Sequence, residues 1–382
     1  MRAWFFLLRF SLILTATMLS AVEANPAAQS SDNFVPVTDT MLQNPSPDNW
    51  PMWRRTLNGW GYSPLEQVTS QNVAELQLVW SRALSSGTSQ QGTPLVYDGV
   101  MYMPNPRDVI QAIDAVTGDL RWEHRRDVPD DIAEYVGGLE DTNRNLAIYD
   151  NLIIDTSADD YVFALDAMTG RVVWETQILD YKTVPARQSS GPIIANGKVI
   201  SGRSCRPRGG PYSCIITAHD ATTGEELWRT STIPRPGEPG DESWGGVPFE
   251  QRWHVGAWMV ASYDPTLNLI YMGTSVTAPA PKFRLGGVSN KHLYHNSTLA
   301  LNGDNGDITW YYQHLNDHWD LDHPYERILV DTAVAPDPST VSWINPRLQP
   351  GERRKVVTGI PGKTGIVFTL DRETGEFLWA TP

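Results

Sequence analysis

The sequence predicts an all-β protein built as a β-propeller, on two observations: a turn motif repeated with a fixed tryptophan, and short apolar strand pairs ahead of the turns. In each copy Asp or Asn stands four residues before Gly and eight before Trp. The five copies are Asp114–Trp122, Asp166–Trp174, Asp220–Trp228, Asn302–Trp310 and Asp371–Trp379. Asp bonds forward to backbone N–H groups and Gly takes positive φ, so each motif suits a tight turn. Each turn is expected to join two strands, with the Trp docking the second strand.

The segments ahead of the first three turns supply the rest of the repeating unit. Residues 93–103, 146–155 and 191–200 each place apolar runs on both sides of an Asp-Gly, Asp-Asn or Asn-Gly pair, which is typical of a hairpin. A β-sandwich that reuses one hairpin is the alternative, and five copies in one register favour the propeller. The insertions 232–246 and 333–354 are rich in Pro and Gly and are expected to form loops.

The amino terminus predicts export. Residues 1–24 carry two arginines around an apolar run and end in Ala-Val-Glu-Ala, which fits a cleaved signal peptide and a periplasmic protein. Residues 25–44 are polar and are expected to form an extended leader, and residues 45–382 form the propeller domain. Acidic residues outnumber basic ones by 44 to 30, and the net charge of −14 argues against a nucleic-acid partner.

The two cysteines, Cys205 and Cys214, are nine residues apart in a loop rich in turn-forming residues. An oxidising compartment allows them to pair, and we expect a structural disulfide. Metal binding by these cysteines is disfavoured, because no Cys-x-x-Cys motif or nearby His pair accompanies them.

The sequence 316–323 gathers carboxylates and imidazoles that can bind a hard cation or act as a base. In an extended segment Asp320 and Asp322 project to the same side. Taken alone, this stretch is typical of a solvated acidic turn. Lys363 lies among glycines, but a strand follows where a nucleotide-binding loop needs a helix, so it offers a cation for an anionic or carbonyl ligand instead. Arg144, directly before a strand, can clamp a carboxylate.

These residues and the Trp repeats together resemble the pyrroloquinoline-quinone (PQQ)-dependent alcohol dehydrogenases of the methanol, ethanol and membrane glucose dehydrogenase type. The resemblance runs from about Asp48 to Pro382, and the Trp-Asp-x-Asp element at Trp319 is its more specific part. It implies an eight-bladed quinoprotein propeller. The chain ends just after the fifth repeat Trp, so about five blades are expected, and a second chain that completes the ring is one alternative.

The resemblance implies a dehydrogenase that oxidises an alcohol, polyol or sugar hydroxyl, with cytochrome c or a membrane quinone as electron acceptor. Asp320 matches the catalytic base, and Lys363 matches the residue that bonds the quinone oxygens and assists catalysis. Arg144 matches the residue that holds a PQQ carboxylate, and Trp258 the indole under its ring. Gln91 matches a polar cofactor-contact position, and Ser189 and Ser204 are looser matches.

The resemblance also bears on a metal ion, either Ca²⁺ or a lanthanide. Asp320 approaches the metal in the family, and Asp322 matches a second carboxylate of lanthanide-using members. The position of a ligating Glu falls in the Cys205–Cys214 loop, and Val276 replaces a ligating Asn. A rebuilt metal site and an absent one both stay open. The alternative to an enzyme is a non-catalytic propeller scaffold or an inactive piece of a quinoprotein.

Overall fold

The computed structural model describes residues 34–84, 89–138, 142–278, 282–285, 289–316, 319–341 and 343–382. The predicted signal peptide, residues 1–24, and the first part of the predicted leader lie outside these ranges. No helix within them has the length and apolar character that a membrane span requires.

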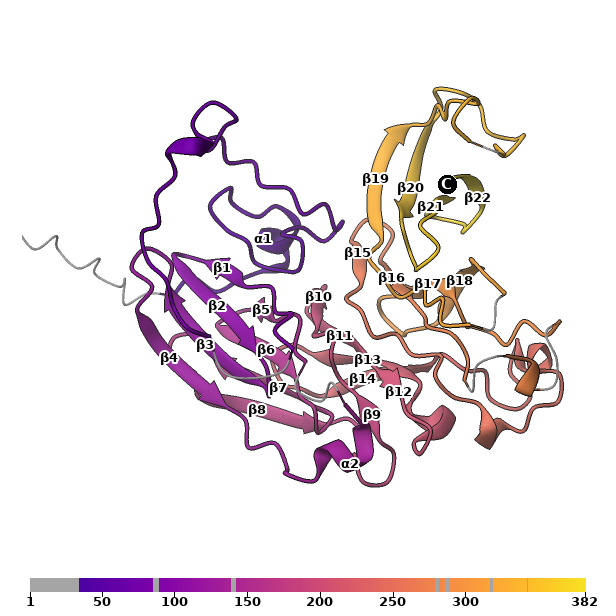
Figure 1. Cartoon of the computed structure of the whole chain (residues 1–382), viewed down its shortest axis with the longest axis horizontal. Helices are drawn as coiled ribbons and strands as arrows, with labels where there is room; N and C mark the ends of the chain where they lie inside the picture. Colours follow the sequence, from indigo (N-terminus) through magenta and orange to yellow (C-terminus); the bar gives the residue numbers. More distant parts are fainter. Residues whose placement is uncertain are drawn as a thin grey trace, which may run out of the picture. The chain divides into compact units, whose positions relative to one another are not determined.

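The described residues form five antiparallel four-stranded sheets, each built from strands in chain order (Figure 1). The first sheet holds β1 (Leu95–Tyr97), β2 (Val100–Asn105), β3 (Val109–Asp114) and β4 (Leu120–Arg125), and the second holds β5 (Ala147–Tyr149), β6 (Leu152–Thr156), β7 (Tyr161–Asp166) and β8 (Val172–Gln177). The third holds β10 (Ile193–Ala195), β11 (Lys198–Gly202), β13 (Ile215–Asp220) and β14 (Glu226–Ser231). The fourth holds β15 (Ser262–Asp264), β16 (Leu269–Gly273), β17 (Ser297–Asn302) and β18 (Ile308–Gln313), and the fifth holds β19 (Ile328–Ala333), β20 (Arg353–Gly359), β21 (Val367–Asp371) and β22 (Phe377–Thr381). A separate pair joins β9 (Ala186–Arg187) to β12 (Ser204–Cys205).

Helices are short and lie in the connections. They are α1 (Asp39–Gln43), α2 (Ile132–Val136) and the 3₁₀ turns η1 (Val73–Glu75), η2 (Gly210–Ser213), η3 (Asp241–Trp244), η4 (Phe249–Gln251) and η5 (Lys282–Leu285). Helix α1 falls in the predicted leader, so this part of it is not extended. Thr38 caps the helix by accepting a hydrogen bond from the Met41 N–H, and Leu42 is buried. These contacts hold the segment against the sheets.

The repeat motif forms the turn between the third and fourth strands of each sheet. In the first copy, Asp114 Oδ1 accepts hydrogen bonds from the backbone N–H groups of Val116 and Thr117, each 3.0 Å long, and Gly118 has φ +77°. A forward-bonding carboxylate and a left-handed residue are what this turn needs, which explains why Asp and Gly recur together.

The repeat tryptophans join neighbouring sheets, whereas the sequence analysis expected each to dock its own second strand. A Cβ added to Gly170 would lie 2.5 Å from the Trp122 ring, and one on Gly224 equally close to Trp174. The Trp122 indole N–H also donates to the Ala167 carbonyl at 2.9 Å. The first four repeat tryptophans, Trp122, Trp174, Trp228 and Trp310, therefore each cover the repeat glycine of the next sheet, and glycine is required because a side chain would displace the indole.

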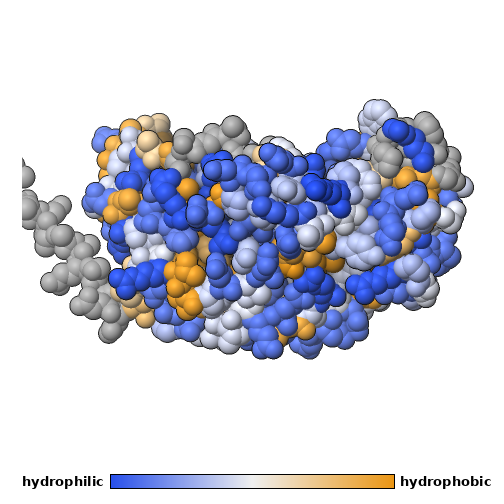
Figure 2. Space-filling model, turned by 90° about the horizontal axis from the view of Figure 1, so that it is seen from below, coloured by the Kyte–Doolittle hydropathy of each residue, from blue (hydrophilic) through white to orange (hydrophobic). Residues whose placement is uncertain are grey.

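Apolar side chains fill the space between sheets. Ile200 and Ala218 of the third sheet share a buried cluster with Ile270 and Leu299 of the fourth, and the repeat Trp228 closes it. The outer surface seen in Figure 2 is largely polar, with apolar groups in small scattered areas. The sheets are thus held together by their faces, which leaves the loops at their ends free to carry a site.

The direction of the strands determines which loops lie at each of the two ends of a sheet. In each antiparallel sheet the repeat turn lies at the end where the third strand finishes. The segment leading into the first strand and the loop between the second and third strands both lie at the opposite end. Residues before β5, β10, β15 and β19, and those between β20 and β21, therefore share the end that the repeat turns leave free.

Candidate functional site

Loops from different sheets bring a cation, two aromatic rings and a second cation together. Arg144 precedes β5, Trp258 precedes β15, Tyr325 precedes β19, and Lys363 lies between β20 and β21. The guanidinium carbon of Arg144 is 5.5 Å from the Trp258 ring centre. Tyr325 meets the same ring edge-on, with centres 5.8 Å apart. We call these residues, together with Asp320 and Asp322, the Trp258 site.

Lys363 links the two predicted carboxylates. Its Nζ donates to Asp320 Oδ1 at 2.7 Å and to Asp322 Oδ2 at 3.4 Å. The Asp320 side chain is 71% exposed and that of Asp322 only 7%, and Asp322 Oδ1 accepts the Val276 N–H at 3.0 Å. Burial opposes the charge on Lys363, but its bond to Asp320 and the nearby Asp322 outweigh burial and raise its pKa. Asp322 is thus fixed, while Asp320 remains open to a ligand.

Arg144 is a half-buried cation whose side chain makes a single hydrogen bond among the described residues: its Nη1 donates to the Ser189 carbonyl at 2.7 Å. Burial lowers the pKa of Arg144, and no carboxylate within the described ranges forms an ion pair with it. A desolvated guanidinium without an anion is unfavourable, so this position suits a ligand that brings one. Ser189, a predicted contact residue, contributes its backbone carbonyl here.

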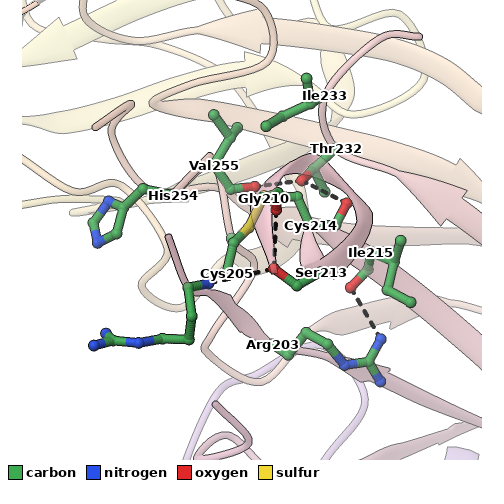
Figure 3. The surroundings of a disulfide bond; sticks show 12 residues. Arg203, Cys205, Gly210, Ser213, Cys214, Ile215, Thr232, Ile233, His254 and Val255 are labelled. Atoms are coloured by element: carbon green, nitrogen blue, oxygen red, sulfur yellow. Dashed lines mark hydrogen bonds between the residues drawn. A yellow bond between two sulfur atoms is a disulfide. The ribbon is translucent and has the colours of Figure 1, made fainter. Parts of the chain in front are cut away.

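The looser sequence matches lie further out. Ser204 is buried in β12, where its Cα would lie 2.8 Å from a Cβ on Gly256, two residues before Trp258. Gln91 is exposed, its amide donates to the Ser89 hydroxyl at 2.7 Å, and none of the described contacts joins it to the Trp258 site. Cys205 and Cys214 are joined by a disulfide, as Figure 3 shows.

His254 and Tyr325 are parts of this region that the sequence analysis did not identify. His254 has φ +80°, a conformation that side-chain-bearing residues rarely adopt. Its Nδ1 lies 3.1 Å from the Val276 carbonyl oxygen, and Asp322 accepts the N–H of the same residue. His254 and Asp322 thus both contact the backbone of Val276. Burial lowers the pKa of His254, and the charge of Asp322 opposes this effect. No spacing in the sequence signals the backbone conformation of His254. Tyr325 could have been chosen as a candidate site residue, because it is an aromatic residue five positions after Asp320.

Comparison with known proteins identifies the family of the chain. Residues 50–382 match the family described as PQQ: Glucose/ethanol/alcohol dehydrogenase, beta-propeller domain. The chain is 32% identical over 354 residues to the alcohol dehydrogenase (quinone), dehydrogenase subunit, of Komagataeibacter europaeus, covering 87% of this chain and 45% of that protein. It is 30% identical over 398 residues to quinoprotein alcohol dehydrogenase PedH of Pseudomonas putida, covering 97% of this chain and 60% of that one.

Solved structures give the same result. Quinohemoprotein alcohol dehydrogenase ADHIIG of Pseudomonas putida superposes with a TM-score of 0.78 at 30% identity, over 91% of this chain and 50% of the other. A europium-containing methanol dehydrogenase superposes with a TM-score of 0.74 at 25% identity, over 90% of this chain and 59% of the other. The chain spans about half the length of the quinone-type alcohol dehydrogenase subunit that it matches. The expected fold is confirmed, and the chain belongs to the β-propeller family of PQQ-dependent glucose, ethanol and alcohol dehydrogenases.

Proposed function

We propose that this chain carries the PQQ site of a periplasmic dehydrogenase that oxidises alcohol, polyol or sugar hydroxyl groups. The observation that supports this most directly is the arrangement of the Trp258 site. The exposed Asp320 carboxylate contacts the Lys363 ammonium, and Arg144, which has no carboxylate partner within the described ranges, lies over the Trp258 ring. The predicted signal peptide supports the periplasmic location. Cytochrome c or a membrane quinone is the proposed electron acceptor, as the family resemblance implies.

The residues fit PQQ chemically. PQQ is a flat tricarboxylate, so it needs an aromatic surface and cationic partners. Trp258 offers the surface, and Arg144 offers a guanidinium that lacks a carboxylate partner within the described ranges. Lys363 would hold a quinone oxygen. When bound, PQQ supplies the two-electron oxidant that takes hydride from the alcohol carbon.

We assign the proton step to Asp320. Its exposed carboxylate is the one that a substrate hydroxyl can reach, whereas Asp322 is buried and bonded on both oxygens. Asp320 would take the hydroxyl proton as the hydride leaves the carbon. Lys363, in contact with Asp320, keeps that carboxylate oriented.

The described residues supply an incomplete metal site. Ca²⁺ takes six to eight oxygen ligands. Here Asp320 and Asp322 contact the Lys363 ammonium, the Val276 N–H occupies an oxygen of Asp322, and no group of three His, Cys, Asp or Glu side chains within the described ranges converges on one point. The proton step is therefore assigned to the side chains alone.

The test is a titration of the purified chain with PQQ, followed by quenching of Trp fluorescence, with Ca²⁺, with a lanthanide, and with a chelator. Binding that requires an added ion would establish a metal site completed by ligands beyond Asp320 and Asp322. Binding with chelator would show that the cationic side chains suffice. No binding by a folded, monodisperse chain would overturn the proposal in favour of a scaffold.

Asp320→Ala is expected to bind PQQ within a few-fold of the unchanged chain and to lose roughly 10²–10⁴-fold in turnover with an artificial electron acceptor, because a general base contributes on that order. Asp304→Asn is the matched control, since Asp304 is exposed in a repeat turn, away from the Trp258 site. Turnover retained by Asp320→Ala in a preparation where the control is active would refute the assignment.

A further inference from the structure

Arg206 is a second half-buried guanidinium that has no anionic partner among the described residues. Its Nε is inaccessible to solvent and has no hydrogen-bond partner, and no described carboxylate forms an ion pair with it. Burial lowers its pKa, and no neighbouring charge offsets that effect. Its Nη2 lies 2.6 Å from where a Cβ on Gly137 would be, so the guanidinium packs directly over that glycine. A cation in this position is costly unless a ligand neutralises it.

The loop that carries Arg206 is rigidly placed. Cys205 is bonded to Cys214, and the Arg206 N–H donates to the Ser213 hydroxyl at 3.3 Å. The carbonyl of Arg206 in turn accepts the N–H groups of Gly209 and Gly210. The backbone on both sides of Arg206 is therefore held, which fixes the position from which its side chain extends.

This loop lies against the segment that leads to Trp258. A Cβ on Gly256 would come within 2.9 Å of the Cys205 nitrogen, so the two backbones touch. Figure 3 shows His254 and Val255 running beside Cys205. Arg206, Asp320 and Asp322 each act electrostatically on His254, which places Arg206 within reach of the same imidazole as the two carboxylates. Arg206 is thus a neighbour of the Trp258 site.

Arg144 precedes the second sheet, and Arg206 lies in the connection between β11 and β13 of the third, yet the two residues share one property. Each is half-buried, and each lacks a carboxylate partner within the described part of the chain. Arg208, in the same disulfide loop, differs, because it is exposed and lies over the Tyr135 ring at 4.6 Å. Two guanidinium groups without a carboxylate partner among the described residues, one over the Trp258 ring and one close enough to act on His254, match a ligand with more than one carboxylate.

We propose that Arg206 binds a carboxylate of the quinone cofactor, so that the disulfide loop supplies a second guanidinium clamp in addition to Arg144. This inference rests on the proposed function. It gives a binding role to a residue in the loop where the family resemblance places a metal-ligating Glu. In that loop, a guanidinium that binds a carboxylate would take the place of a carboxylate that binds a metal.

The test compares PQQ binding to the unchanged chain, Arg206→Gln, Arg206→Lys and Arg208→Gln by Trp fluorescence, after thermal unfolding has shown that all are folded. Loss of a charge-assisted hydrogen bond to a carboxylate should weaken binding by Arg206→Gln on the order of 10- to 100-fold. Arg206→Lys should recover part of this loss, and Arg208→Gln should bind as the unchanged chain does.

A second probe identifies the group that Arg206 recognises. The trimethyl ester of PQQ has no carboxylate charge, so the unchanged chain and Arg206→Gln should bind it with the same affinity. Equal binding of PQQ itself by Arg206→Gln and Arg208→Gln would overturn this inference alone. Absence of PQQ binding by the unchanged chain would overturn the proposed function together with the inference, which keeps the two failures distinct.

Discussion

At the scale of single residues, burial opposes the charge of several acidic side chains in and between the strands. Asp108 is 3% exposed, and burial raises its pKa to about 7, although a hydrogen bond from the Ala158 N–H lowers it and Asp159 raises it further. Asp155 and Asp160 are also fully buried, and burial raises the pKa of both. The protonated form of Asp108 is thus favoured by folding.

Asp108→Asn is expected to flatten the pH dependence of stability. The folded pKa of about 7 lies above the unfolded value of about 4, so the stabilising contribution of Asp108 is complete below pH 4 and is lost as pH rises towards 7. Asn is uncharged, can still accept the Ala158 N–H, and tolerates the φ of +52° at this position. Its Tm relative to the unchanged chain should rise by roughly 2 °C or more between pH 5 and pH 8. A constant difference across that range, as expected for Asp304→Asn, would contradict the prediction.

At this scale the sequence predicted which residues form a site. Arg144, Trp258, Asp320 and Lys363 were assigned through motifs matched to a family, and the structure places these side chains in one group. The convergence itself depends on loops up to 219 positions apart in sequence, Arg144 to Lys363, which no local pattern predicts. The φ of His254 and the missing partner of Arg206 are properties of packing, and residue identity alone does not report them.

At the scale of elements, the Gly and Trp of each repeat act as a contact between sheets. The sequence predicted the turn correctly because Asp-x-x-Thr-Gly determines local backbone geometry. The sequence-based prediction named the wrong partner for the Trp, because a repeated motif does not indicate whether its aromatic residue packs within its own sheet or against the next sheet. The close approach of the Trp122 indole to the Gly170 backbone makes the answer clear, because only glycine leaves room for the ring.

Gly170→Ala should therefore be more destabilising than Gly99→Ala. Both glycines have φ close to +70°, so the backbone strain of about 1–2 kcal/mol is shared. An added Cβ at Gly170 would lie 2.5 Å from Trp122, whereas at Gly99 it would meet nothing within 4 Å. Overpacking typically adds about 1–3 kcal/mol. Urea unfolding gives the two free energies, and equal losses for the two variants would show that the indole adjusts without cost.

At the scale of the whole molecule, one docked tryptophan lacks a sheet of its own among the described residues. Trp80 covers Gly118 of the first sheet, with a Cβ there 2.7 Å from the indole, and its N–H donates to the Ala115 carbonyl at 3.2 Å. This is the contact that the repeat tryptophans make, although Trp80 lies outside the five copies. The neighbouring Leu78 and Val79 are 84% and 83% exposed. The segment is thus anchored on one side and uncovered on the other.

Uncovered apolar side chains beside a docked segment are expected to draw copies of the purified chain together. Replacing Leu78 and Val79 by Lys should lower the weight-average mass measured by sedimentation velocity at tens of micromolar, while Trp80 keeps the segment anchored. Val116→Lys is the control. Val116 is 72% exposed and lies in the repeat turn between β3 and β4, so its replacement should leave the weight-average mass unchanged. A chain that stays monomeric at every concentration, or a double variant that associates as the control does, would show that this surface does not mediate association. Loss of association in the double variant would show that Leu78 and Val79 belong to the surface through which copies of the chain associate.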